Sequence, residues 1–212
     1  MQRLIEGVHR FRTDEFGNYR KLFRKLSQDG QNPQTLFITC SDSRVLAELI
    51  TQSKPGDLFV VKNVGNIVPP ASAAGDTNST AAAIEFAVQM LRVSDIVICG
   101  HSKCGAISAL IGQTPVGKST PHLRYWLRLA GPVVDTMNKE YTHLKTFDER
   151  STAASVENVL FGLDNLHSYP CVQERLMDGT LRLHGWYFKI STAELFAYDP
   201  ETRQFSPLVS EA

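Results

Sequence analysis

The sequence predicts an α/β fold with a central, mainly parallel sheet and helices on both of its faces. Three short runs are apolar on both faces, at residues 35–40, 58–62 and 95–100, and segments with helical spacing lie between them. Strands that are buried on both sides and alternate with helices are typical of parallel sheets. A chain of 212 residues is long enough for one such domain with a sizeable core. We therefore expect a single domain over residues 1–212.

A long helical arm is expected ahead of the first strand, over residues 1–30. Apolar residues recur there at roughly helical spacing, and a break near Phe16–Asn18 would divide the arm into two helices. An amphipathic arm of this length can pack on a neighbouring subunit, or it can cover one face of its own sheet. A loop rich in Gly, Asn and Pro follows at residues 28–33.

Helices and strands alternate along the rest of the chain. The expected helices lie at residues 45–52, 80–92 and 106–111, around Trp126, and, as one or two helices, over 152–177. Residues 63–78 and 112–122 are expected to form loops, and the structure of residues 135–150 is left open. A hairpin over residues 181–200 would add an antiparallel fifth strand at the edge of four parallel strands in the order 2-1-3-4.

The composition argues against several classes of protein. Lys and Arg number 22, as do Asp and Glu, so no nucleic acid or anionic membrane is expected as a partner. No apolar run reaches the ~18 residues that a membrane-spanning helix needs. The first residues lack the apolar region of a signal peptide, so we expect a cytoplasmic protein. In a reducing compartment, its four cysteines favour metal binding or core packing over disulfides.

The first predicted strand runs directly into three reactive side chains. Cys40, Asp42 and Arg44 alternate with two serines, and residues two apart project to the same side of an extended chain. The third strand ends in His101, and Cys104 follows three residues later. Because these two strands are expected to be neighbours, the side chains should meet at the carboxyl edge of the sheet, where open α/β sheets bind ligands.

Two thiolates and one imidazole favour zinc over hard cations such as magnesium. Structural zinc sites usually have four Cys or His ligands, but Cys40, His101 and Cys104 supply only three, so a catalytic site with an open position is expected. Zinc acidifies bound water and so supplies hydroxide near neutral pH. We expect Asp42 to accept a hydrogen bond from zinc-bound hydroxide, and Arg44 to keep Asp42 ionised and off the metal.

The pattern Cys-x-Asp-x-Arg, followed by His-x-x-Cys-Gly, resembles the β-class carbonic anhydrases, zinc enzymes that reversibly hydrate carbon dioxide to bicarbonate. The resemblance covers nearly the whole chain, including residues 35–44, 55–59 and 184–186. It is greatest with the plant-like group, which includes bacterial cyanate-operon and carboxysomal enzymes. It implies one zinc ion per chain on the two cysteines and the histidine, an Asp-Arg dyad, and a cytoplasmic or carboxysomal location.

The resemblance also implies a homo-oligomer with its active sites at subunit boundaries. The family assembles from dimers, often into tetramers or octamers. Gln31 would reach the substrate from a neighbouring subunit. Phe59 and Val64 would line an apolar carbon dioxide pocket together with position 86, and the amide of Gly105 would contribute a hydrogen bond.

Three residues depart from the family pattern. Lys62 stands where members usually carry Arg, so a compact ammonium group replaces a planar guanidinium group. Phe86 stands where plant-like enzymes carry Tyr. Phe37 replaces a Trp that, with an Arg at the position of Lys62, forms an inhibitory bicarbonate site in one subgroup. We therefore expect no such regulatory site, and a metal centre open to water at neutral pH.

The other cysteines and histidines are interpreted mainly as structural. Cys99 and Cys171 are expected to pack in the core, and His184 to have a structural role in the sheet. One of the remaining histidines could be a proton shuttle, and the sequence does not choose among His9, His122, His143 and His167.

Two other functions compete with carbon dioxide hydration. The same fold could hydrolyse another linear molecule, carbonyl sulfide or carbon disulfide. The chain could also be a carboxysome scaffold or recruitment protein with a degraded site, but all five motif residues are intact, which argues against degradation.

Overall fold

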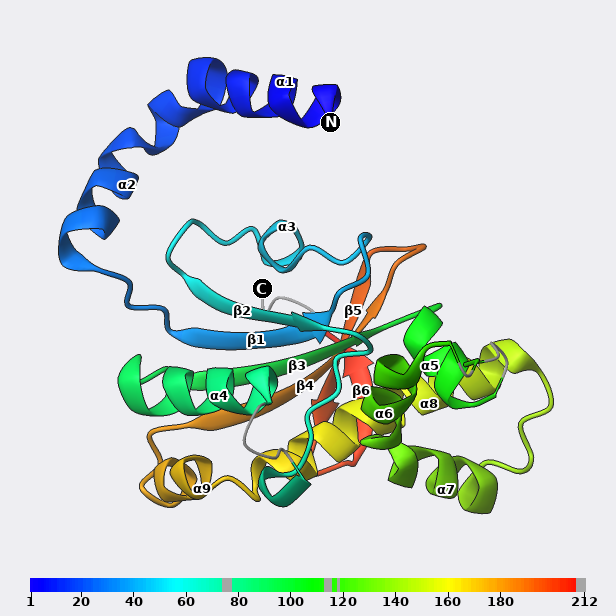
Figure 1. Cartoon of the computed structure of the whole chain (residues 1–212). Helices are drawn as coiled ribbons and strands as arrows, with labels where there is room; N and C mark the ends of the chain where they lie inside the picture. The colour runs from blue at the N-terminus through cyan, green and yellow to red at the C-terminus, as the bar shows by residue number, and fades with distance from the viewer. Residues whose placement is uncertain (74–77, 113–115, 118, 209–212) are drawn as a thin grey trace.

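The computed structural model describes residues 1–73, 78–112, 116–117 and 119–208. Within these residues, six strands form one sheet in the order β2-β1-β3-β4-β5-β6 (Figure 1). The first four in this order are parallel: β2 (Leu58–Asn63), β1 (Thr35–Cys40), β3 (Asp95–His101) and β4 (Arg182–Lys189). The expected α/β fold and the order 2-1-3-4 are therefore confirmed.

Two antiparallel strands complete the sheet, where the sequence predicted only one. β5 (Glu194–Asp199) pairs with β4, and β6 (Gln204–Pro207) pairs with β5. The sheet therefore has six strands within the described residues, and the prediction of five was wrong. β6 gives little sequence signal because it is short, ends in proline, and only Phe205 is partly buried, with its ring 5.4 Å from that of Tyr198.

The helices lie on both faces of the parallel sheet. Figure 1 shows α3 on one face and α4, α8 and α9 on the other. The helix bounds are α1 (Gln2–Arg10), α2 (Phe16–Asp29), α3 (Ala47–Thr51), α4 (Ser79–Glu85), α5 (Gly105–Leu110), α6 (Pro121–Arg128), α7 (Gly131–Glu140), α8 (Phe147–Leu166) and α9 (Pro170–Met177). None of the described helices is long and apolar enough to cross a membrane.

The N-terminal arm stands away from the sheet (Figure 1). The arm is divided into two helices, as expected, but the irregularity lies just before the expected Phe16–Asn18, because α2 begins at Phe16 and runs through Gly17. The irregularity is a π-helical turn at Phe11–Glu15, which joins α1 to α2. The arm has no buried residue, and apolar side chains such as Leu4 and Val8 are exposed. The arm therefore does not cover its own sheet.

Helix α8 supports the strand that ends in His101. It begins at Phe147, earlier than expected, because Thr146 and Glu149 form a capping box at its start. Gly100, just before the end of β3, lets α8 approach closely, since a Cβ there would lie 2.8 Å from the Val159 side chain. The end of β3 is thereby fixed against a helix.

Candidate metal centre and substrate site

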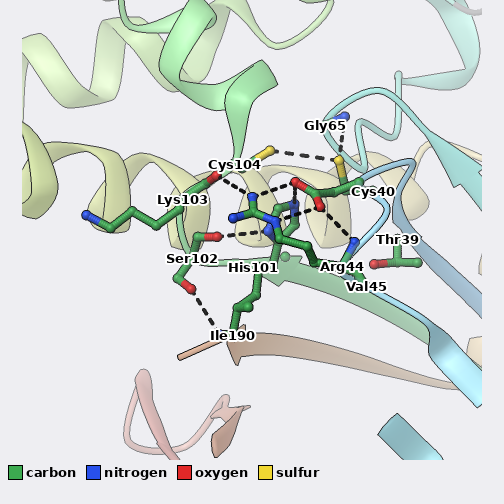
Figure 2. Close-up of polar contacts among 12 residues, drawn as sticks. Thr39, Cys40, Arg44, Val45, Gly65, His101, Ser102, Lys103, Cys104 and Ile190 are labelled. Atoms are coloured by element: carbon green, nitrogen blue, oxygen red, sulfur yellow. Dashed lines mark hydrogen bonds and ion pairs between the residues drawn. The ribbon is translucent and has the colours of Figure 1, made fainter. Parts of the chain in front are cut away.

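Three side chains at the carboxyl edge of the sheet form a buried cluster. The ligand atoms of Cys40, His101 and Cys104 all lie within 4.8 Å of one another. Cys40 ends β1, His101 ends β3, and Cys104 immediately precedes α5 (Figure 2). Because β1 and β3 are adjacent parallel strands, their ends meet at the same edge. The sequence predicted this convergence, and the structure places all three residues together.

The His101 ring is oriented for metal binding. Its Nδ1 lies 2.9 Å from the Ser102 carbonyl oxygen, so Nδ1 carries the proton and donates it there. Nε2 is then a buried acceptor, and it has no hydrogen-bond partner among the described residues. The nearest Asp42 oxygen is 4.0 Å away. A buried, unpaired imidazole nitrogen facing two thiols fits a metal ion better than it fits an apolar core.

The pKa values of the two thiols in the cluster are shifted in opposite directions. Their sulfur atoms are 3.9 Å apart. The hydrogen bond from Cys104 lowers the pKa of Cys40 to about 4, against the effect of burial, and the same contact raises the pKa of Cys104. The pair therefore loses one proton readily and holds the second unless a cation compensates the charge. Two thiols and an imidazole are a donor set that fits zinc.

Asp42 and Arg44 form an ion pair directly beside the cluster. Arg44 Nε donates to Asp42 Oδ1 at 2.9 Å, and Nη2 donates to Oδ2 at 2.7 Å. These hydrogen bonds hold the pKa of Asp42 well below its usual range. Arg44 Nη2 also donates to the Lys103 carbonyl oxygen at 3.1 Å. The pair thus ties the turn after β1 to the turn after β3, as Figure 2 shows.

Lys62 has a structural contact that sequence reasoning missed. Its Nζ donates to the carbonyl oxygens of Val45, at 2.7 Å, and Asp42, at 3.2 Å. The ammonium therefore holds the turn that carries the dyad. Lys62 lies on β2 opposite Thr39 on β1. This contact depends on strand pairing between distant segments, so only the three-dimensional register reveals it.

The residues expected to bind substrate fall into two groups. Val64 is 42% exposed and precedes Gly65, whose amide contacts Cys40, while Gly105 follows Cys104 as the first residue of α5. These two positions therefore lie beside Cys40 and Cys104 of their own chain.

The second group lies away from those cysteines. Phe59 pairs with Leu36, four strand positions before Cys40, or about 13 Å along the sheet. The Phe86 ring packs on Phe59, with ring centroids 5.8 Å apart, and is 43% exposed. Gln31 is exposed in the loop before β1, at the opposite edge of the sheet from Cys40. The three residues are not brought to the metal centre of the same chain.

The remaining cysteines and His184 occupy structural positions. Cys99 and Cys171 are buried in the core, as predicted, and burial raises the pKa of Cys99 to about 12. His184 Nε2 lies 2.8 Å from Asp95 Oδ1, near the amino ends of β3 and β4. The histidine is therefore far from the metal cluster along the strands, in agreement with a structural role.

Fold and site together define an α/β protein with a buried Cys-His-Cys cluster at the carboxyl edge of its sheet, whose donor set fits a zinc ion. An ionised carboxylate, held by a guanidinium, lies beside that cluster.

Comparison with known proteins identifies the family. The sequence model of the carbonic anhydrase family matches residues 35–195. The chain is 43% identical to a carbonic anhydrase of Synechocystis sp. over 205 residues, which are 97% of this chain and 73% of that protein. The solved structure of the β-carbonic anhydrase CcaA superposes with a TM-score of 0.93 at 42% identity, covering 100% of this chain and 93% of the other.

A tetrameric β-carbonic anhydrase from Sordaria macrospora is also similar, with a TM-score of 0.74, 31% identity and 92% of each chain covered. The chain therefore belongs to the β-carbonic anhydrase family. This confirms the resemblance and the enzyme class expected from the sequence, and the family membership supports carbon dioxide hydration as the activity.

Proposed function

We propose that the chain hydrates carbon dioxide reversibly to bicarbonate and a proton, using one zinc ion held by Cys40, His101 and Cys104. The observation that carries the proposal is the convergence of these three ligand atoms within 4.8 Å, beside an ionised Asp42–Arg44 pair. A zinc ion bound there would supply Lewis acidity, which lowers the pKa of water and provides hydroxide near neutral pH.

Asp42 has the role of orienting the nucleophile. Its Oδ2 lies 4.0 Å from the metal-facing nitrogen of His101, so a carboxylate oxygen borders the place where a water must lie. Because the pKa of Asp42 is lowered, its carboxylate stays an acceptor at neutral pH and can align the lone pair of the attacking oxygen. Arg44 engages both carboxylate oxygens and so keeps Asp42 from becoming a ligand itself.

The apolar part of the substrate site is assigned to two chains. Val64 and the Gly105 amide serve the site of their own chain, because they adjoin Cys40 and Cys104. Gln31, Phe59 and Phe86 would serve the site of a neighbouring subunit, since they lie well away from their own ligands along the sheet. A complete site therefore requires a homodimer or a higher homo-oligomer.

Two other properties are proposed along with this activity. The Lys62 ammonium is occupied by backbone carbonyl groups, and Phe37 is buried beneath α3 rather than offering a polar group, so the chain should lack the inhibitory bicarbonate site. The cytoplasmic or carboxysomal location stays a prediction from the sequence.

Stopped-flow assays with carbon dioxide, carbonyl sulfide and carbon disulfide as alternative substrates test the proposal. We expect fast carbon dioxide hydration and little release of sulfide from carbonyl sulfide or carbon disulfide. Negligible hydration together with sulfide release would favour the hydrolase. If the zinc-loaded protein catalysed neither reaction, that result would favour the scaffold function.

Replacement of a ligand gives a second test. Cys40→Ser should lose zinc and hydration activity together, because a serine hydroxyl is a poor zinc ligand. Cys99→Ala is the matched control: this thiol is also buried on the sheet but is not a member of the cluster, and its loss should leave the zinc content unchanged. Full turnover by Cys40→Ser would contradict the ligand assignment.

A further inference from the structure

A peptide group from the loop after β2 contacts the sulfur atom of Cys40. The Gly65 amide nitrogen lies 3.4 Å from the Cys40 sulfur and donates a hydrogen bond to it (Figure 2). Gly65 is buried, has a φ of +82°, and a Cβ there would lie 3.0 Å from the Ala106 Cβ. The position therefore requires glycine on both conformational and steric grounds.

Trp126 acts on the other side of that same peptide group. Its indole Nε1–H donates to the Val64 carbonyl oxygen at 2.6 Å. The Val64 carbonyl and the Gly65 amide belong to one peptide unit, in which the C=O and N–H bonds point in opposite directions. The indole thus lies on one side of this unit and the Cys40 sulfur on the other. A hydrogen bond to the carbonyl polarises the peptide and makes its N–H a stronger donor.

Asn158 holds the next peptide group along the chain. It lies on α8, is 1% exposed, and donates from Nδ2 to the Gly65 carbonyl oxygen at 2.9 Å. Two helices, α6 and α8, therefore fix the carbonyl groups on either side of the Gly65 Cα. Rotation of the Val64–Gly65 peptide away from Cys40 would break one or both of these hydrogen bonds.

We propose that Trp126 and Asn158 are positioning residues of the metal centre, which act through the Val64–Gly65 peptide to keep its N–H on the Cys40 sulfur. This N–H withdraws charge from the thiolate and fixes the sulfur in place, so it sets both the donor strength of Cys40 and the retention of the metal. The inference rests on the proposed zinc site and deepens it.

Cobalt substitution tests the inference by a signal other than activity. Co²⁺ bound to a thiolate shows a sulfur-to-cobalt charge-transfer band, whose energy falls when the sulfur loses a hydrogen bond. In Trp126→Phe, which keeps an aromatic ring and removes the donor, we expect this band to move to longer wavelength. We also expect a chelator to remove zinc about tenfold faster, the lower end of the usual effect of losing a group that supports a ligand.

The chain offers a matched control for each residue. Trp186 is the other tryptophan, also partly buried, and its ring packs edge-on against Phe37 rather than on the loop of Gly65. Asn165 is buried on α8 and donates to the Val68 carbonyl oxygen at 2.7 Å, so Asn165→Leu loses the same type of bond as Asn158→Leu. Trp186→Phe and Asn165→Leu should keep the wild-type band and the wild-type rate of zinc release.

The outcomes separate this inference from the function on which it rests. A shifted band and faster zinc release in Trp126→Phe and Asn158→Leu, but not in their controls, would support it. If both variants match their controls in band and release rate, the inference is wrong while the zinc site stands. If the wild-type chain shows no thiolate-to-cobalt band, the proposed metal centre itself is overturned, and this inference with it.

Discussion

The Asp42 carboxylate is engaged at both oxygens by one guanidinium, and the Arg44 backbone amide adds a third hydrogen bond at 3.0 Å. All three donors belong to the residue two positions away, so the turn after β1 creates this environment locally. That local origin explains why the sequence alone predicted the pair. Two other groups contact this segment from further along the chain. Lys62, on β2, donates to the Asp42 carbonyl oxygen, and the Gly65 amide, in the loop after β2, donates to the Cys40 sulfur.

Replacement of Asp42 should separate metal binding from turnover. Asp42→Asn keeps the shape but weakens the acceptor, so we expect the zinc content to be unchanged and kcat to fall about a hundredfold, a typical effect of removing a positioned acid–base group. Metal analysis and stopped-flow hydration measure the two quantities. Asp148→Asn, a change at a nearby exposed carboxylate paired with Lys103, should have wild-type kcat. Equal turnover in both variants would contradict the role of Asp42.

The metal centre should also stay open to water under mildly basic conditions. Arg44 holds both Asp42 oxygens, and Lys62 holds the backbone of the same turn, so we expect the carboxylate to stay off the metal at pH 8. A crystal structure of the zinc-loaded chain at that pH is the check. A direct bond from Asp42 to zinc there would disprove this expectation.

Elements that bury an apolar stripe were the most predictable from the sequence. The strands β1, β2 and β3 were predicted directly from their apolar runs. β1 and β3 are buried on both faces, and β2, at the edge of the sheet, is partly buried. β6 was missed because three of its four residues are exposed. Most of α7 lies in the segment 135–150, whose structure was left open because the segment is mostly polar. The loop after β2 was correctly predicted to lack regular structure as far as residue 70. The 3-10 turn at Ala71–Ala73 was not predicted, and residues 74–77 lie outside the described residues. Which helices would fix that loop could not be predicted, because Trp126 and Asn158 are more than sixty residues away in the sequence.

The amino ends of β3 and β4 are joined by a cluster around Asp95. Its oxygens accept hydrogen bonds from Arg182 at 2.8 and 2.9 Å and from Ser94 at 2.6 Å, and they contact His184 at 2.8 Å. Burial opposes the charge, but these donors hold the pKa of Asp95 below its usual range. A carboxylate with a lowered folded-state pKa stabilises the fold above its unfolded-state pKa of about 3.9, and this stabilisation is lost as the pH falls through the folded-state pKa.

Asp95→Asn should therefore destabilise the fold in a pH-dependent way. We expect its urea midpoint to lie below that of the wild type at pH 7, and the difference to shrink at pH 3. Asp135→Asn, at an exposed position on α7, should follow the wild type at both values. A difference that grows as the pH falls would show that the Asp95 cluster does not behave as an ionised pair.

At the scale of the whole molecule, the exposed arm and the proposed division of the substrate site between two chains both favour a homo-oligomer. The arm exposes apolar side chains at positions 4, 8 and 11, which share one face of the helix. The Phe11 ring packs on Phe16 and Phe23 of the same arm, with ring centroids 6.1 and 6.5 Å apart, but stays 42% exposed. Gln31, Phe59 and Phe86 lie away from the metal centre of their own chain. A second copy of the chain would explain both observations, because it could cover the apolar face of the arm and bring its own metal centre to Gln31, Phe59 and Phe86. The family resemblance implies such an assembly.

Polar substitution of that apolar face should dissociate the oligomer. The triple variant Leu4→Ser, Val8→Ser and Phe11→Ser should sediment as a smaller species than the wild type and lose much of its hydration activity while keeping its zinc. The double variant Arg3→Ser and Arg10→Ser alters exposed charges on the same arm and should keep the wild-type sedimentation coefficient. An unchanged assembly in the triple variant would contradict a role for the arm in association.

The central claim is that carbon dioxide hydration depends on one zinc ion at the Cys40–His101–Cys104 centre. The most direct test is to remove the metal with a chelator, add zinc back in steps, and record stopped-flow hydration at each step. We predict that activity rises in proportion to bound zinc and reaches its limit at one ion per chain. Activity that persists without metal, or that requires a different number of ions, would contradict the claim.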